Sequence, residues 1–151
     1  MSTVTGIEGV KALAGKDQGT GEWLEITQER INAFADATDD HQWIHVDPER
    51  AKAGPFGTTI AHGFLTLSLT LPLLRGAGPR VEGVKMAINY GLDRVRFPAP
   101  VRVGKRIRAH SKNLSVNEVE GGVQVVNEVT VEIEGEPKPA CVAQLVARYY
   151  F

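Results

Sequence analysis

The second half of the chain holds four successive segments with the residue pattern of β-strands, and this pattern restricts the possible folds more than any other feature. The segments span residues 84–97, 102–117, 122–133 and 140–149, and each is rich in β-branched and aromatic residues with partial alternation. Residues 120–122 (Glu-Gly-Gly) predict a hairpin turn between the middle pair, and residues 135–139 predict another turn. Consecutive strands with short turns indicate an antiparallel sheet.

The first half carries the signals of helix starts. Thr27 is followed by polar residues and then by apolar residues at helical spacing, which predicts a helix over about residues 28–37. Asp47 and Pro48 predict the start of a second, shorter helix. The polar segment 38–46 separates the two helices, and the glycines and proline of residues 54–57 mark a loop.

The leucine-rich segment 64–74 fits two kinds of structure. Leucines at every second position from Leu65 to Leu73 alternate with hydroxyl residues and Pro72, as in a strand. Leucine also favours helices, and Leu65, Leu69 and Leu73 would share one helical face, with Gly76 as the stop. Periodicity alone does not decide between them. A single apolar helix beside an antiparallel sheet would be covered if the sheet curls around it.

Composition narrows the class of protein. The chain has 151 residues, 42% hydrophobic and 23% charged, which fits one globular domain with one core. The net charge of −1 gives no reason to expect nucleic acid or a membrane as a partner. Cys141 is the only cysteine, and residues 1–15 lack the apolar run of a signal peptide or membrane span. We therefore expect a cytoplasmic protein.

Asp40 and His45 lie in the polar segment directly before the second helix start. A carboxylate and an imidazole can share one water molecule, orient it and accept its proton, and histidine suits this because its pKa lies near neutrality. On spacing alone, helix capping at the surface explains the pair at least as well. The wider pattern of motifs favours the catalytic interpretation.

Six residues of types that bind metals gather in this part of the sequence: Asp39, Asp40, His41, His45, Asp47 and His62. His41 and His45 are four positions apart, as in helix-borne zinc sites. The segment lacks both the helical pattern and the intervening glutamate of that motif. We therefore expect no metal.

Three separated motifs occur together: Asp40-His-Gln-Trp-Ile-His45, Phe56-Gly-Thr-Thr-Ile-Ala-His-Gly63 and, more loosely, Arg94-Val-Arg-Phe-x-x-Pro-Val101. In this order they resemble the signature of MaoC-like dehydratases and (R)-specific enoyl-CoA hydratases, especially the branch of nodulation protein N. The resemblance covers about half of the chain. Three residues depart from it, because Asp39, Gln42 and Trp43 stand where the family has Gly, Asn and Pro.

The resemblance implies an α+β fold, a single hot-dog domain over residues 1–151 with an antiparallel β-sheet wrapped around a central helix, and it assigns segment 64–74 to that helix. It implies an enzyme of fatty-acid metabolism that adds water to a trans-2-enoyl thioester and gives an (R)-3-hydroxyacyl thioester. Asp40 and His45 would hold the water against C3, and the backbone N–H of Gly63 would stabilise the enolate oxygen. No metal, nicotinamide or flavin is needed, and coenzyme A enters only as part of the substrate.

The same motifs supply residues for substrate binding. Gln42 keeps an amide that can orient a partner, Trp43 and Phe56 would form walls of the acyl pocket or part of the core, and His62 would line the pocket or cap the central helix. Arg94 and Arg96 share a strand face that would meet coenzyme A phosphates, or else be a solvated or dimer-edge face.

Two other functions compete with the hydratase. A hot-dog thioesterase would carry a carboxylate on or near the central helix, but residues 62–74 contain no Asp or Glu. A non-catalytic acyl-thioester-binding module would have no use for Asp40 and His45. The resemblance also implies a homodimer whose two sheets join edge to edge, which would remove exposed strand edges and place the active sites at the subunit interface. The acyl-chain length, the pathway, and whether coenzyme A or acyl carrier protein bears the acyl group stay open.

Overall fold

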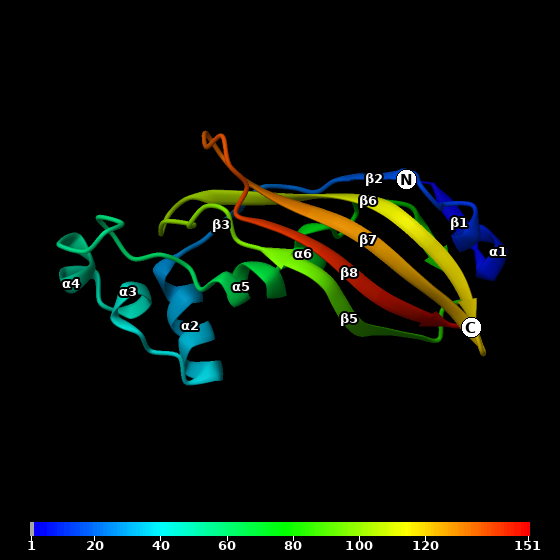
Figure 1. The fold of residues 1–151 in the computed structure, drawn as a ribbon, viewed down its shortest axis with the longest axis horizontal. Coiled ribbons are helices and arrows are strands. Elements are labelled where there is room, and N and C mark those ends of the chain that lie inside the picture. Colours follow the sequence, from blue (N-terminus) through cyan, green and yellow to red (C-terminus); the bar gives the residue numbers. More distant parts are fainter. Residues whose placement is uncertain (1) are drawn as a thin grey trace.

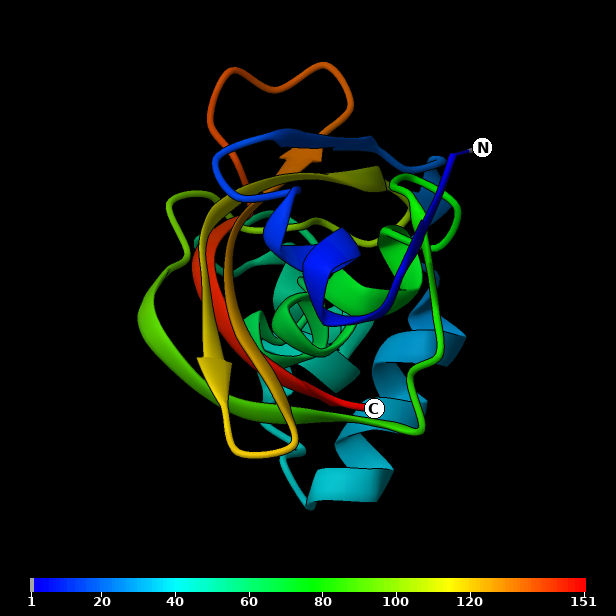
Figure 2. The same ribbon diagram turned by 90° about the vertical axis from the view of Figure 1, so that its right-hand side faces the viewer.

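A strongly curved antiparallel sheet wraps around a central helical segment in the computed structural model, which describes residues 2–151. The sheet order is β2-β6-β7-β8-β5, and the short β3 also pairs with β6. Its strands are β2 (Asp17–Thr20), β3 (Leu24–Glu25), β5 (Met86–Arg96), β6 (Arg106–Val119), β7 (Gly122–Ile133) and β8 (Cys141–Tyr150). Figure 2 shows the sheet curving around the helices, as the sequence predicts for an α+β hot-dog domain.

The helices occupy three places relative to the sheet. The central segment consists of α5 (Gly63–Ser68) and α6 (Thr70–Leu73). At one end lie α2 (Gln28–Thr38), α3 (Trp43–Val46) and α4 (Pro48–Lys52), and at the other end lies α1 (Gly6–Lys11) (Figure 1). Beside α1, the strands β1 (Thr3–Thr5) and β4 (Arg80–Glu82) form a separate parallel pair.

Buried and more exposed side chains alternate along β6 and β7, and the buried ones form part of the core. Ile107 and Ala109 on β6, with Val129 and Val131 on β7, are fully buried in the cluster that also contains the central leucines. The β6–β7 hairpin closes with Val119 opposite Gly122, and Gly121 adopts a positive φ of 77° in the turn. A residue with a Cβ atom rarely adopts this conformation, which explains the glycine there.

The prediction of a helix for segment 64–74 is confirmed, in the form of two short helices that meet at Leu69. Leu65, Leu69 and Leu73 are all buried, as expected for one face. Pro72 lies inside α6, and Gly76 follows with a positive φ of 79°. This short interrupted geometry explains why the sequence pattern did not distinguish helix from strand.

Both predicted helix caps are confirmed. The Thr27 hydroxyl accepts a hydrogen bond from the backbone N–H of Arg30, and the Asp47 carboxylate accepts one from that of Arg50. The strand prediction over 102–117 was wrong at its beginning, because Gly104 turns the chain with a φ of 86° and β6 starts only at Arg106. No helix among residues 2–151 is long and apolar enough to cross a membrane.

Candidate active site

The loop that carries Asp40 begins where α2 ends. Asp39 caps the helix in the left-handed conformation, with φ 58° and ψ 24°. The chain then reverses direction, so that Asp40 precedes α3 and His45 lies within it. The position that holds glycine in the resembled motif thus needs a backbone conformation that glycine adopts freely and aspartate tolerates.

His45 is buried and held at both its ring and its backbone. Its Nδ1 lies 2.7 Å from the carbonyl oxygen of Ile60. Because a carbonyl oxygen only accepts hydrogen bonds, Nδ1 carries the hydrogen and Nε2 of the neutral ring is left with a lone pair. The backbone carbonyl of His45 accepts a hydrogen bond from Nε2 of Gln28 at 2.7 Å.

The electrostatic surroundings keep the His45 ring neutral. Burial lowers the pKa of His45 and outweighs the hydrogen bond to Ile60, which raises it. The neighbouring His62 lowers the pKa further, and Asp40 raises it. A neutral imidazole with a free Nε2 can accept a proton.

Asp40 is about half exposed, with 53% of its side chain accessible to solvent. One carboxylate oxygen accepts a hydrogen bond from the backbone N–H of Gln42 at 3.4 Å, and the other lies 4.0 Å from Nε2 of His62. The carboxylate is therefore anchored at one oxygen and remains open to a ligand.

His62 lies beneath the pair and is only 3% exposed. Its ring stacks on His45, with 3.8 Å between ring centroids and an angle of 22° between the ring planes. The His62 ring also contacts Phe34, with 4.8 Å between ring centroids and 57° between the ring planes. Nε2 of His62 donates to the backbone carbonyl of Asp40 at 2.9 Å, and Nδ1 has no hydrogen-bond partner among the described residues.

Gly63 is the first residue of α5, as predicted. A Cβ atom at this position would lie 3.2 Å from the ring of Phe97, closer than most side-chain contacts. A cavity of about 260 Å³ opens beside Gly63. Phe56, Thr66 and Phe97 are among the residues that line it. A second, mainly apolar cavity of about 290 Å³ lies between the central helices and strands β5 and β8.

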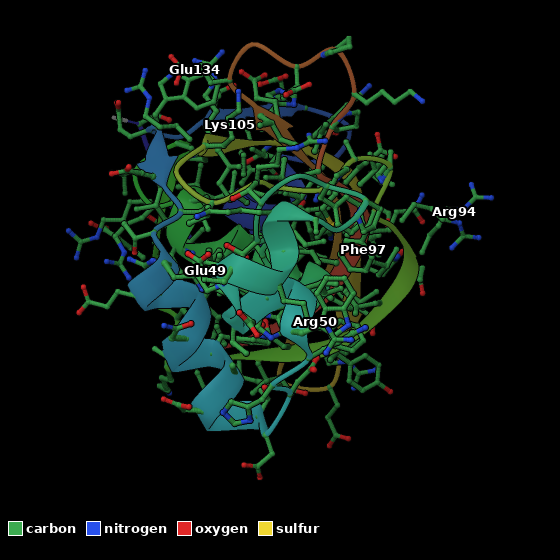
Figure 3. The ribbon with its side chains drawn as sticks, turned by 90° about the vertical axis from the view of Figure 1, so that its left-hand side faces the viewer. Glu49, Arg50, Arg94, Phe97, Lys105 and Glu134 are labelled. Carbon is green, nitrogen blue, oxygen red and sulfur yellow. The ribbon has the colours of Figure 1, made fainter. Side chains whose placement is uncertain are left out.

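The side chains of four other predicted site residues have different surroundings. Gln42 is exposed, and the Trp43 ring packs against Gly54 and beneath the guanidinium of Arg50. Arg94 and Arg96 are exposed on β5, and Figure 3 shows Arg94 projecting away from the ribbon while Phe97 lies nearer the helices.

One cluster of possible metal ligands includes the candidate catalytic pair. Asp40, His45 and His62 each offer a ligand atom, and these atoms lie within 4.8 Å of one another. His41 is outside the cluster, because its Nε2 lies 2.8 Å from the exposed carboxylate of Asp36. The spacing of His41 and His45 by four therefore does not produce a shared site.

The sequence did not reveal the residues that hold His45 in place through hydrogen bonds. Gln28 bridges the His45 backbone and the hydroxyl of Thr59, which is 1% exposed. The backbone of Ile60 supplies the carbonyl that fixes the His45 ring and also bonds to Ile44. These partners are separated from His45 by about fifteen residues or more, and no periodic pattern or motif signals such contacts.

A curved sheet around a short central helix, with a loop at the helix N-terminus that brings Asp40, His45 and His62 together, is the architecture of a hot-dog domain. The family model described as "MaoC like domain" matches residues 10–135. The chain therefore belongs to the MaoC-like dehydratase family.

Individual proteins agree with this assignment. The chain is 58% identical over 150 residues to 3-hydroxyacyl-thioester dehydratase Z of Mycobacterium tuberculosis, covering 99% of each chain. It is 47% identical over 145 residues to nodulation protein N of Rhizobium leguminosarum bv. viciae, covering 94% of this chain and 89% of that one. The solved structure of an (R)-hydratase from A. caviae shares the fold, with a TM-score of 0.73, 22% identity and coverage of 91% and 97%.

The family, its nodulation protein N branch and the hot-dog fold expected from the motifs are thus confirmed. The expectation of an enzyme of the hydratase/dehydratase class is confirmed as well.

Proposed function

We propose that the protein is an (R)-specific enoyl-CoA hydratase, which adds water to a trans-2-enoyl thioester to give an (R)-3-hydroxyacyl thioester. The observation that carries the proposal is the hydrogen bond from Nδ1 of His45 to Ile60, because it leaves Nε2 unprotonated near the Asp40 carboxylate. The 58% identical relative named as a 3-hydroxyacyl-thioester dehydratase supports the substrate class.

In the proposed reaction, one water molecule lies between Nε2 of His45 and the Asp40 carboxylate. His45 accepts one proton from the water as its oxygen bonds to C3 of the enoyl group. The C2–C3 double bond becomes the enolate of the thioester, and the proton is then delivered to C2 on the same face. Water is consumed and no electrons are gained or lost overall.

The developing enolate oxygen needs a hydrogen-bond donor, and we assign the backbone N–H of Gly63 to this role. The first N–H groups of a helix have no partner within the helix and carry partial positive charge. A glycine also allows a thioester to approach the backbone closely, because it has no side chain. A Cβ atom here would lie 3.2 Å from the Phe97 ring, which lines the same cavity. Phe56, beside the same cavity, would contact the thioester, and the apolar cavity along β5 would take the acyl chain.

Coenzyme A, or an acyl carrier protein, enters only as the thiol part of the substrate. Arg94 and Arg96 are exposed and would pair with its phosphates, and Gln42 and Trp43 are assigned to the rim of the site. The exposed edge of β5 favours a homodimer, in which the partner would complete the acyl pocket.

The proposed chemistry is redox-neutral and uses acid–base groups of the chain itself, so we expect no metal or cofactor requirement. Protein treated with EDTA and dialysed should keep its full hydration rate, measured against protein supplied with Zn²⁺. Loss of activity on chelation, restored by a metal, would instead assign the Asp40–His45–His62 cluster to metal binding.

The thioesterase alternative has little support from the site. Segment 62–74 supplies no carboxylate, and Cys141 is buried, which raises the pKa of its thiol to about 11 and disfavours a thiolate nucleophile.

The first experiment measures hydration of trans-2-enoyl-CoA substrates from short to long chains by loss of the enoyl thioester absorbance, with the product configuration checked by chiral analysis. Asp40→Asn and His45→Gln should each lower kcat by at least about a hundredfold, as expected for loss of a general base. His41→Gln is the matched control, because its ring bonds only to exposed Asp36. An inactive parent that still binds acyl-CoA would favour a binding module and exclude the hydratase.

A further inference from the structure

We propose that His62 is a positioning residue, which fixes the positions of the Asp40 and His45 side chains relative to the backbone N–H of Gly63. The inference rests on the proposed hydration and deepens it. The sequence interpretation offered His62 as a pocket wall or a helix cap. His62 is the N-cap residue of α5, without a capping hydrogen bond from its side chain. Two contacts of that side chain and the covalent bond to Gly63 point to a further role.

The first contact fixes the Asp40 loop. Nε2 of His62 donates a hydrogen bond of 2.9 Å to the backbone carbonyl of Asp40. The Asp40 side chain itself is half exposed and has only a long hydrogen bond to the backbone of Gln42. The His62 hydrogen bond is therefore a main restraint on where the carboxylate can lie.

The second contact supports the other member of the pair. The His62 ring stacks on His45 at 3.8 Å between centroids and is backed by Phe34. The hydrogen bond to Ile60 fixes the direction of the His45 ring, and the stacked His62 ring limits its tilt. Together they determine where Nε2 of His45 points.

The third link is covalent. His62 directly precedes Gly63 and is the N-cap residue of α5, and its carbonyl accepts hydrogen bonds from Leu65 and Thr66. A single residue thus connects both water-activating groups to the backbone that would hold the enolate oxygen. A shift of about 1 Å between such groups can lower a rate about a hundredfold.

Packing alone does not account for a histidine at this position. The side chain is 3% exposed, and its Nδ1 has no hydrogen-bond partner within residues 2–151. A buried polar atom without a partner destabilises a fold, so an apolar ring would fill the same space at lower cost. What the histidine adds is the N–H directed at Asp40. Because it is almost fully buried, it offers little surface to a substrate.

The test compares two replacements of His62. Phenylalanine keeps an aromatic ring for stacking but removes the N–H, whereas glutamine loses the ring and keeps a donor at about the reach of Nε2. In His62→Phe we expect kcat to fall about 30- to 100-fold with KM changed less than about threefold. The kcat of His62→Gln should be at least about tenfold higher than that of His62→Phe. His41→Phe, at the exposed histidine of the same loop, should leave both constants unchanged.

A second readout is independent of activity. Hydrogen–deuterium exchange of peptides covering residues 38–46 should be faster in His62→Phe than in the parent and should return toward the parent rate in His62→Gln. If the phenylalanine variant does not fold, His62→Asn replaces it, because its shorter amide does not reach the Asp40 carbonyl.

Three results would overturn the proposal: an unchanged kcat in His62→Phe, a glutamine variant no better than the phenylalanine variant, or an effect on KM alone, which would make His62 a substrate-binding residue. A parent protein without hydratase activity would overturn the proposed function instead. The exchange rates of residues 38–46 would then decide by themselves whether His62 holds the loop.

Discussion

At the scale of single residues, the burial of His45 has a consequence for the dependence of activity on pH. Burial lowers its pKa, and the charged or titratable groups that face it are Asp40 and His62. The proposed base must be neutral, so we expect the acid limb of kcat/KM to lie below the ordinary histidine pKa of about 6.5. A pH–rate profile together with an NMR titration of His45 measures this. An acid limb above about 7 would contradict the assignment.

The same shift affects stability. In the unfolded chain His45 binds a proton more tightly than in the folded protein, so its contribution to the free energy of unfolding is fully present above about pH 6.5. That contribution is lost as the pH falls through the folded pKa.

Asp39 illustrates a different residue-scale constraint, because its backbone has a φ of 58°. We expect Asp39→Ala to lower the free energy of unfolding by about 1 kcal/mol, since a left-handed conformation is costly for a residue with a plain Cβ. Asp39→Gly should cost less, because glycine adopts this conformation freely. Urea unfolding of both variants measures the difference, and an alanine variant more stable than the glycine variant would refute the argument.

The sequence singled out the candidate catalytic residues but not the residues that support them. Asp40 and His45 were proposed because they belong to a motif with fixed spacing. The bridge through Gln28 and the hydrogen bond to Ile60 were not, because they depend on how α2, α3 and the segment before α5 pack together. Local patterns carry no information about such distant contacts.

At the scale of elements, the central helical segment has one buried face and one exposed face, and substitutions on the two faces should differ in their effect on stability. Leu73 is 4% exposed in the core, whereas Leu71 is 53% exposed. Leu73→Ala should destabilise the protein by about 2–4 kcal/mol through loss of burial and creation of a cavity. Leu71→Ala is the matched control and should cost less than about 1 kcal/mol. Thermal or urea unfolding compares the two variants, and equal losses of stability would contradict the burial of one helical face and the exposure of the other.

Elements were predictable where a local signal defines them. The caps Thr27 and Asp47 define α2 and α4, and the glycine turn defines the β6–β7 hairpin. The parallel pair of β1 and β4 was not predicted, because three-residue strands have no measurable periodicity. The position of β5 beside β8 was not predicted either, since pairing between strands so far apart in sequence depends on the closure of the whole sheet.

At the scale of the whole molecule, β5 is the last strand in the sheet order and carries exposed apolar side chains: Met86, Ile88, Tyr90 and Leu92. Unpaired strand edges with such side chains favour association with another strand. We expect a homodimer in solution, measured by size-exclusion chromatography with light scattering. A monomer at micromolar concentration would contradict this expectation.

The variant Ile88→Lys should shift this equilibrium toward monomer, because it places a charge on the β5 edge. Leu114→Lys is its control, since Leu114 is a similarly exposed apolar residue on β6, which lies inside the sheet order rather than at its end. If both lysines have the same effect, β5 is not the contact.

The residues proposed to activate water, and those that hold them, all lie between Gln28 and Gly63, whereas the strands that surround the central helix, apart from short β2 and β3, follow Met86. The proposed reaction centre and most of the curved sheet thus belong to consecutive stretches of the polypeptide. Phe56, at the cavity beside Gly63, lies in the earlier stretch, whereas β5 and β8 in the later stretch line one side of the apolar cavity. Substitutions on β5 can therefore change the shape of that cavity while the residues proposed to activate water stay unchanged.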